Sequence, residues 1–222
     1  IQGEGCTGGN CDRRAAYLQA ATDLLVSDLT EMVGNWEAEG PARTAVTTDP
    51  QKGILAILTG MGSLSYGELG GERMKLGLML NDPEEEHDCF SDNTHNSHFY
   101  DGLGIRNVYL GSYTRTDGSA LTGPSLSELV AAADPAVDTQ LKAELDASVM
   151  ALQAVKDAGD AGKTYDTLIA PGNAEGEALI MGAVNALVTQ TASIDRAVSA
   201  LGLSKVDFEG SDSLDNPNAV FQ

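Results

Sequence analysis

The sequence has few basic residues and few aromatic ones. Only 13 of its 222 residues are Lys or Arg, against 33 Asp or Glu, so the formal net charge is -20, and aromatic residues make up 5%. A chain this acidic repels a phosphate backbone or an anionic membrane surface wherever salt does not screen the charge. We therefore expect no nucleic-acid partner.

Long apolar runs are also missing. No stretch approaches the roughly 18 consecutive apolar residues of a membrane-spanning helix, so we expect no transmembrane segment. Apolar residues nevertheless make up 42% of the chain and charged residues 21%, close to the average of globular proteins. The length suits one large domain or two small ones, so we expect a folded chain.

Cysteine is scarce, with three residues in all. Cys6 and Cys11 enclose a glycine-rich turn that can close as a local disulfide, which is typical of an exported protein; the alternative is three free thiols in a cytosolic one. The chain begins at Ile1 without a methionine or a signal peptide. We interpret it as a processed product and expect part of the protein to be missing.

Hydrophobic periodicity predicts four long helices. Apolar residues recur at intervals of three and four in these ranges: 12–38, 50–80, 135–158 and 174–202. Two of the helices start with an aspartate followed by a proline, a good cap and a good first-turn residue. A capping-box pattern predicts a short helix over 125–133. The expected fold is an all-α, up-and-down helical bundle without a convincing strand pair.

The chain divides into three parts on this view. A glycine-rich N-terminal segment (1–11) precedes the bundle (12–202), and a C-terminal tail follows it (203–222). Between the second and third long helices, residues 81–123 have little periodicity, although loops usually run to about 4 to 6 residues. Because this segment contains several aromatic residues, we predict a long ordered loop, with a short helix possible over 103–110.

Two glutamates lie on the apolar face of the predicted helix 50–80. At about 100° per residue, Glu68 and Glu72 share a face with Leu58 and Met61. A buried carboxylate has to be paired, hydrogen-bonded, metal-bound or protonated. One interpretation is an ion pair with Arg73, or a bend that lets the glutamates reach water; the other is a functional site.

The same helix is rich in glycine along one side. Gly53, Gly60, Gly67 and Gly71 follow one another at about heptad spacing, and each costs up to about 1 kcal/mol of helix propensity relative to alanine. We expect another backbone to approach closely along this side. The alternative is a helix that is kinked or interrupted near Gly70 and Gly71.

The segment 81–123 also contains every histidine of the chain, with acidic residues between them: His87, Asp92, His95, His98 and Asp101. Imidazole and carboxylate together suit iron, zinc, copper or manganese, whereas the acidic run 84–86 suits calcium. The spacings of the common zinc-protease, EF-hand, Walker and nucleophile-elbow motifs are absent. The alternative is that these histidines are polar residues hydrogen-bonded in place.

Three sequence blocks resemble the imelysin-like proteins, and within them the branch called iron-regulated protein A. They are Gly-Gly-Glu-Arg-Met (70–74), Glu-Glu-Glu-His-Asp-Cys-Phe-Ser-Asp-Asn-Thr-His (84–95) and Gly-Ile-Arg-Asn-Val-Tyr-Leu-Gly (104–111). The resemblance covers about 12 to 202. It implies an exported bacterial protein, periplasmic or anchored to the outer membrane as a lipoprotein, with two related helical bundles and a site between them. It also implies a connection with iron uptake and an older label as a metallopeptidase.

One motif of that family is missing. The family has Gly-x-His-x-x-Glu in its first half, and the nearest approach here is His98-x-x-Asp101, with Asn96 in place of the glycine. We therefore interpret the chain as the second half of such a protein. The expected partners are its missing N-terminal half and an envelope iron-transport component.

The leading hypothesis is a metal-handling binding protein of the cell envelope, without catalysis. Its acidic pocket, completed by the missing half, is expected to be lined by these residues: Glu68, Glu72, Arg73, His87, Ser91, Asp92 and His95. The expected ligands of iron or zinc are Glu72, His87 and His95. One alternative is a zinc peptidase in which a further glutamate activates water. Another is a structural or receptor-like bundle whose acidic face binds a partner.

Overall fold

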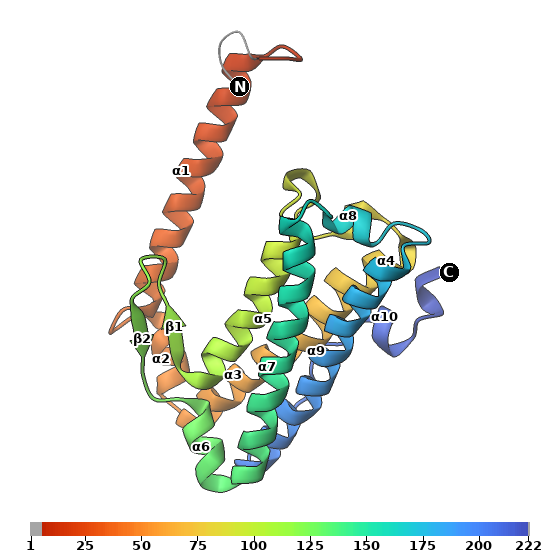
Figure 1. Cartoon of the computed structure of the whole chain (residues 1–222). Helices are drawn as coiled ribbons and strands as arrows, with labels where there is room; N and C mark the ends of the chain where they lie inside the picture. Colours follow the sequence, from red (N-terminus) through yellow and green to blue (C-terminus); the bar gives the residue numbers. More distant parts are fainter. Residues whose placement is uncertain (1–5, 222) are drawn as a thin grey trace. The chain divides into compact units, whose positions relative to one another are not determined.

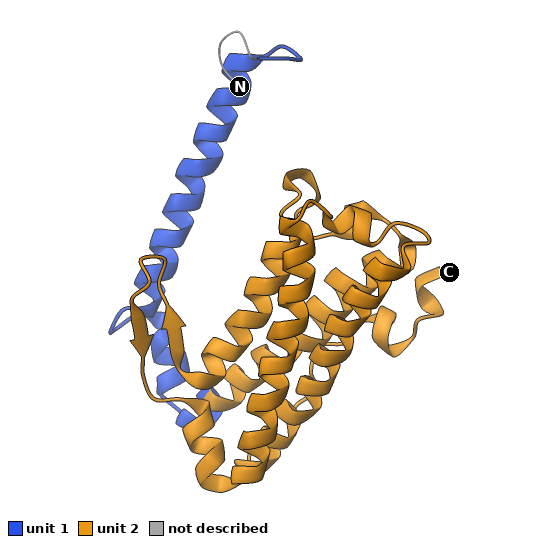
Figure 2. Cartoon of the chain, viewed as in Figure 1, with its two compact units in different colours: residues 1–53 blue, residues 54–222 orange. Residues whose placement is uncertain are grey.

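The computed structural model describes residues 6–221 (Figure 1), and it divides the chain into two compact units (Figure 2). The first unit covers 1–53, described from Cys6, and the second covers 54–222, described to Phe221. This division falls inside a helix, whereas the sequence suggested boundaries after residues 11 and 202. The described residues are helical apart from loops and one two-stranded hairpin, so the predicted all-α class is confirmed.

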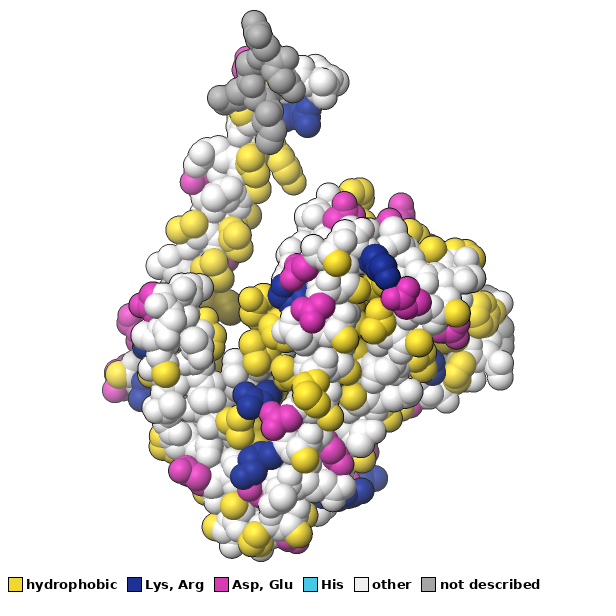
Figure 3. Space-filling view, viewed as in Figure 1, with side chains coloured by type: hydrophobic (Ala, Val, Ile, Leu, Met, Phe, Trp, Pro, Cys, Tyr) yellow, Lys and Arg dark blue, Asp and Glu magenta, His cyan; other side chains and the backbone are white. Residues whose placement is uncertain are grey.

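The first unit consists of two helices, α1 (Cys11–Trp36) and α2 (Pro41–Thr47). Cys6 and Cys11 form a disulfide where α1 begins. No side chain of α1 is buried, and its large apolar residues are all exposed (Figure 3): Tyr17, Leu18, Leu24, Leu25, Val26, Leu29, Met32, Val33 and Trp36. The predicted apolar stripe is thus present, but this unit does not bury it.

The second unit is a helical bundle. Its elements are α3 (Pro50–Ser63, which starts in the first unit), η2 (Leu64–Lys75), α4 (Leu76–Leu80), η3 (Pro83–Glu85), η4 (Cys89–Ser91), α5 (Thr94–Leu110), β1 (Ser112–Thr114), β2 (Ala120–Thr122), α6 (Leu126–Ala133), α7 (Pro135–Asp160), α8 (Tyr165–Leu168), α9 (Ala174–Ala200), α10 (Asp212–Asp215) and η5 (Ala219–Phe221). The predicted helix 50–80 is therefore present as one uninterrupted helix, and its middle part, η2, is a π-helix.

The core of the bundle lies around α7 and α9, which pack along their length (Figure 1). Leu141 of early α7 shares one apolar cluster with Ile194 of late α9. Leu152 of late α7 shares a second cluster with Ile180 of early α9. The two helices are therefore antiparallel, and α5 and η2 complete the bundle against them.

The predicted long loop is only partly a loop. Within residues 81–123 the structure has the 17-residue helix α5 and a hairpin in which Ser112 pairs with Thr122. The buried face of α5 includes Thr94, His98 and Gly102, as well as the apolar residues Ile105 and Tyr109. Because polar residues and glycine make up most of that face, hydrophobic periodicity could not reveal most of this helix.

The C-terminal segment packs against the glycine side of η2. A Cβ atom at Gly67 would clash with the backbone of Glu209, and one at Gly71 would clash with Ser211. The predicted close approach of another backbone is therefore confirmed at Gly67, and Gly71 packs equally closely on the same segment. The predicted close approach is wrong at Gly60, where a Cβ would meet open space.

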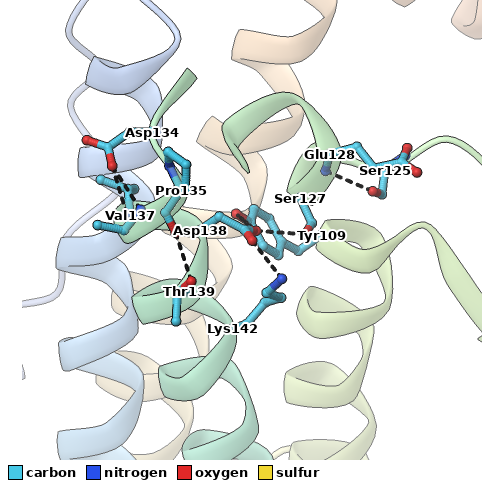
Figure 4. Close-up of polar contacts among 11 residues, drawn as sticks. Tyr109, Ser125, Ser127, Glu128, Asp134, Pro135, Val137, Asp138, Thr139 and Lys142 are labelled. Carbon is cyan, nitrogen blue, oxygen red and sulfur yellow. Dashed lines mark hydrogen bonds and ion pairs between the residues drawn. The ribbon is translucent and has the colours of Figure 1, made fainter. Parts of the chain in front are cut away.

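A buried carboxylate ties α7 to α5 and α6 (Figure 4). Asp138 is 3% exposed and accepts hydrogen bonds from Tyr109 Oη at 3.0 Å and Ser127 Oγ at 2.7 Å, while Lys142 Nζ lies 2.6 Å from Oδ2. Desolvation by itself raises the pKa of Asp138, but the bonds from Lys142, Ser127 and Tyr109 outweigh it and lower that pKa below its usual value.

We predict that Asp138→Asn lowers the free energy of unfolding by about 1 to 3 kcal/mol at pH 7, because the charged acceptor of three donors is lost. A carboxylate with a depressed pKa stabilises the fold above its unfolded pKa of about 3.9, and that stabilisation is lost as pH falls through the folded pKa. The difference in the free energy of unfolding between the variant and the wild type should therefore shrink in acid. Urea unfolding followed by circular dichroism at several pH values measures both effects.

The matched control is Asp146→Asn, also on α7, whose carboxylate pairs with Arg106 but is 57% exposed. We expect it to change the free energy of unfolding by less than about 1 kcal/mol. Equal losses in the two variants would contradict a special role for Asp138.

Candidate functional site

The first component of the site is an ion pair on η2. Arg73 Nε and Nη2 lie 2.9 and 2.8 Å from Oε1 of Glu68, five residues earlier in the chain. In an α-helix, residues five apart are separated by about 140° around the axis. The i to i+5 hydrogen bonding of a π-helix brings them nearly into line. The pairing of Glu68 with Arg73 that the sequence suggested is therefore present, and it depends on the π-helical form.

The two glutamates are not buried as predicted. The side chain of Glu68 is 43% exposed, and Glu72 is also partly exposed. The buried face of η2 is formed instead by residues such as Ser65, Leu69 and Met74. Because the π-helix has more residues per turn than the α-helix assumed in the sequence analysis, the predicted face is rotated.

The second component is the segment that leads into α5. Thr94 Oγ1 donates to Glu86 Oε2 at 2.8 Å and accepts from the backbone N–H of Asp88 at 3.0 Å. Ser97 Oγ donates to the Asp88 carboxylate. Burial raises the pKa of Glu86, against the opposing effect of the bond from Thr94. These bonds fasten the segment to the first turns of α5 and fix the position of His87 between Glu86 and Asp88.

Two histidines and an aspartate meet at this point. His87 Nδ1 lies 3.7 Å from Asp101 Oδ2, and the rings of His87 and His98 are 6.1 Å apart between centroids. His98 and Asp101 are three residues apart on α5, hence on the same side of that helix. Burial raises the pKa of Asp101, while the nearby His87 and Arg73 oppose that rise. The ion pair of η2 therefore lies close enough to act electrostatically on this group.

His98 has an unusual environment for a histidine. It is fully buried, and the edge of its ring meets Tyr165 of α8 at 4.8 Å between centroids. Among residues 6–221, neither of its ring nitrogens has a hydrogen-bond partner. Burial, with smaller effects from His87, Arg73 and His95, lowers the pKa of His98 to about 3. The imidazole is neutral at physiological pH, which is the form that binds metal ions.

The remaining predicted site residues lie elsewhere. His95 Nε2 lies 3.4 Å from Asp160 Oδ1, and its ring packs where a Cβ of Gly159 would be. Ser91 and Asp92 are both exposed, and Ser91 Oγ donates to the Asp88 carbonyl at 3.3 Å. His95 therefore faces α7 and packs there.

No ready-made cage for a metal ion is present in the part of the chain that the structure describes. Nowhere in residues 6–221 do three or more His, Cys, Asp or Glu side chains lie together as metal ligands would. The predicted ligand set of Glu72, His87 and His95 is therefore not assembled. His87, His98 and Asp101 do not form such a ligand set either, and metal binding stays a prediction.

His98 and Asp101 were not among the predicted site residues, although both lie in the predicted histidine-rich segment. Their spacing places them on one side of a helix only once α5 is known to be a helix. Tyr165 was not singled out, and Glu86 was noted only as part of the acidic run 84–86. Tyr165 follows α5 by more than fifty residues and gives no local signal, whereas Glu86 belongs to an acidic run in which nothing distinguishes the buried member.

The fold and the site together define a helical-bundle protein with a polar His/Asp cluster between its π-helix and α5. The family model for imelysin (Peptidase_M75) matches residues 5–194. The chain therefore belongs to the imelysin family, as its sequence blocks suggested. A search of the curated proteins gave no match. Across the described residues, no helix is both long enough and apolar enough to cross a membrane.

We predict that His98 makes the protein acid-sensitive. Its pKa is about 3 in the folded chain and about 6.5 when unfolded. The unfolded state therefore binds more protons below pH 6.5, and stability on the order of 1 to 2 kcal/mol should be lost between pH 6.5 and 5. In His98→Gln this part of the pH dependence should disappear. Urea unfolding at both pH values measures it, and an unchanged pH dependence in the variant would contradict the burial of a neutral imidazole.

Proposed function

We propose that this imelysin-family protein binds a metal ion, or a metal-containing ligand, beside His87, His98 and Asp101, and that it serves iron or other metal acquisition in the bacterial cell envelope. The observation that supports the proposal is the buried, neutral His98, whose two ring nitrogens find no partner in the described chain. Buried polar groups without a partner are rare and usually indicate a ligand, an ion or a bound water.

The chemistry of the donors suits iron or zinc. Imidazole nitrogens and carboxylate oxygens are common ligands of both. The Nδ1 of His87 faces the Asp101 carboxylate, an arrangement that orients a metal-binding histidine and leaves Nε2 for the metal. His98 would supply the second nitrogen. The Arg73 and Glu68 pair would balance charge near the ion, as both already influence Asp101.

The cellular setting is part of the same proposal. A disulfide between Cys6 and Cys11 is typical of oxidising compartments, which supports a periplasmic location or an outer-membrane anchor. The exposed apolar stripe of α1 is the kind of surface that partners cover. We propose that the other helical bundle of the family completes the pocket, that a partner covers the apolar stripe of α1, and that an envelope iron-transport component receives the metal.

We expect calorimetric titration with Zn²⁺ and Fe²⁺ to show one site. His98→Gln and His87→Gln should each weaken binding by about 10-fold or more, because each removes a nitrogen donor. The matched control is His95→Gln, a histidine of the same helix as His98 that contacts Asp160 instead, and it should change affinity by less than about 2-fold.

Thermal melts of the same variants separate lost binding from lost folding. Unchanged affinity in both the His87 and His98 variants would remove these residues from the site, and no binding by the wild type would overturn the proposal. Peptide hydrolysis that disappears on chelation would favour the peptidase interpretation instead.

A further inference from the structure

The length of η2 requires an explanation. It runs for 12 residues, whereas π-helical geometry usually appears as single turns within α-helices. Three glycines lie within it, and they weaken the preference for a regular α-helix. Weak propensity permits the π form but does not select it, so contacts from outside the helix have to hold it.

The C-terminal segment 209–215 supplies such contacts along one side. Ser213 Oγ donates a hydrogen bond of 3.0 Å to the carbonyl oxygen of Gly71. The same oxygen accepts from the backbone N–H of Leu76, five residues on, which is a π-type bond. A carbonyl oxygen has two lone pairs and can accept both. The segment therefore bonds to the very group that distinguishes the π form.

Further bonds fix the segment on either side of that point. Tyr66 Oη donates to Asp215 Oδ1 at 2.7 Å, and Ser63 Oγ accepts from the backbone N–H of Glu209 at 3.0 Å. Asp215 Oδ2 also accepts from the backbone N–H of Ser211 at 3.1 Å. Ser211 and Ser213 are both buried, and so is the bond from Ser213 to Gly71, whereas the bonds of Tyr66 and Ser63 to the segment are exposed.

The glycine side of η2 packs closely on the C-terminal segment. Gly67 and Gly71 have no space for a Cβ against residues 209–211. In an α-helix the Gly71 carbonyl would accept from Lys75 instead of Leu76. The return to that form would rotate Arg73 away from Glu68, because residues five apart face different sides of an α-helix.

We propose that residues 209–215 clamp η2 in its π-helical form and thereby position the Glu68–Arg73 pair beside Asp101. Ser213 and Asp215 are positioning residues: they act through Gly71 and Tyr66 and do not reach the site themselves. The clamp follows from the contacts alone. Its effect on metal affinity rests on the proposed function.

The test follows the Arg73 Nε–H signal by ¹H–¹⁵N NMR, since a merely stabilising role would not move it. Glu68→Gln gives the signal of an arginine without its ionised partner. Ser213→Ala and Tyr66→Phe each remove one bond of the clamp and should shift the Arg73 signal toward that reference, with at least about 3-fold faster exchange with water.

Two glycine substitutions provide a further test variant and its matched control. Gly71→Ala should shift the Arg73 signal furthest, because its Cβ meets Ser211, whereas Gly60→Ala on the preceding helix α3 meets open space and should leave it unchanged. If Gly71→Ala does not fold, the Arg73 signals of Ser213→Ala and Tyr66→Phe decide whether the clamp exists. An Arg73 signal that stays at its wild-type position in both would overturn the clamp.

Metal titration of the same variants keeps the two proposals apart. A wild type that binds no metal, combined with a moved Arg73 signal in Ser213→Ala, refutes the proposed function and supports the clamp. If the wild type binds metal but the Arg73 signal does not move in either clamp variant, the proposed function is supported and the clamp is refuted.

Discussion

The buried hydroxyl of Ser65 fixes the register on which the rest of the bundle depends. Ser65 Oγ donates to the carbonyl of Leu187 at 3.0 Å and accepts from Gln190 Nε2 at 2.8 Å, while Gln190 Oε1 accepts from Ser148 at 2.5 Å. These bonds join η2, α9 and α7 at the middle of an otherwise apolar core. A buried polar group that loses its partner is costly, so sliding any of the three helices is penalised. Apolar packing alone would discriminate less between alternative registers of the helices.

That register determines what the site can be. With η2 fixed against α9, Glu68 and Arg73 lie near enough to Asp101 to influence it, and the Thr94 and Ser97 bonds hold the segment that contains His87. The deepest residue of the group, His98, packs against Tyr165. The site is thus made by η2, by the segment 86–101 and by Tyr165 of α8, and none of them forms it alone.

Much of the fold could be predicted from the sequence because α1, α7 and α9 each have a regular apolar stripe and recognisable ends. Asp134 caps α7, as its pairing with Pro135 suggested. The helix α5 could not be predicted beyond its C-terminal part, since Thr94, His98 and Gly102 interrupt its buried face. The π-helix could not be predicted either, because its bonding follows from contacts with a segment far along the chain. For these two reasons the sequence did not show how Glu72, His87 and His95 would lie relative to one another.

The bond between Ser213 and Gly71 spans 142 residues of sequence, and this has a consequence for the order of folding. Helices such as α3 and α7 can form as soon as their own residues are available. The contacts that define η2 have to wait until residues 209–215 have been made, and domains fold as units as the chain emerges. The arrangement of Glu68 and Arg73 therefore matures after the helices of the bundle, so a chain that stops before residue 209 would have its helices but an unfinished site.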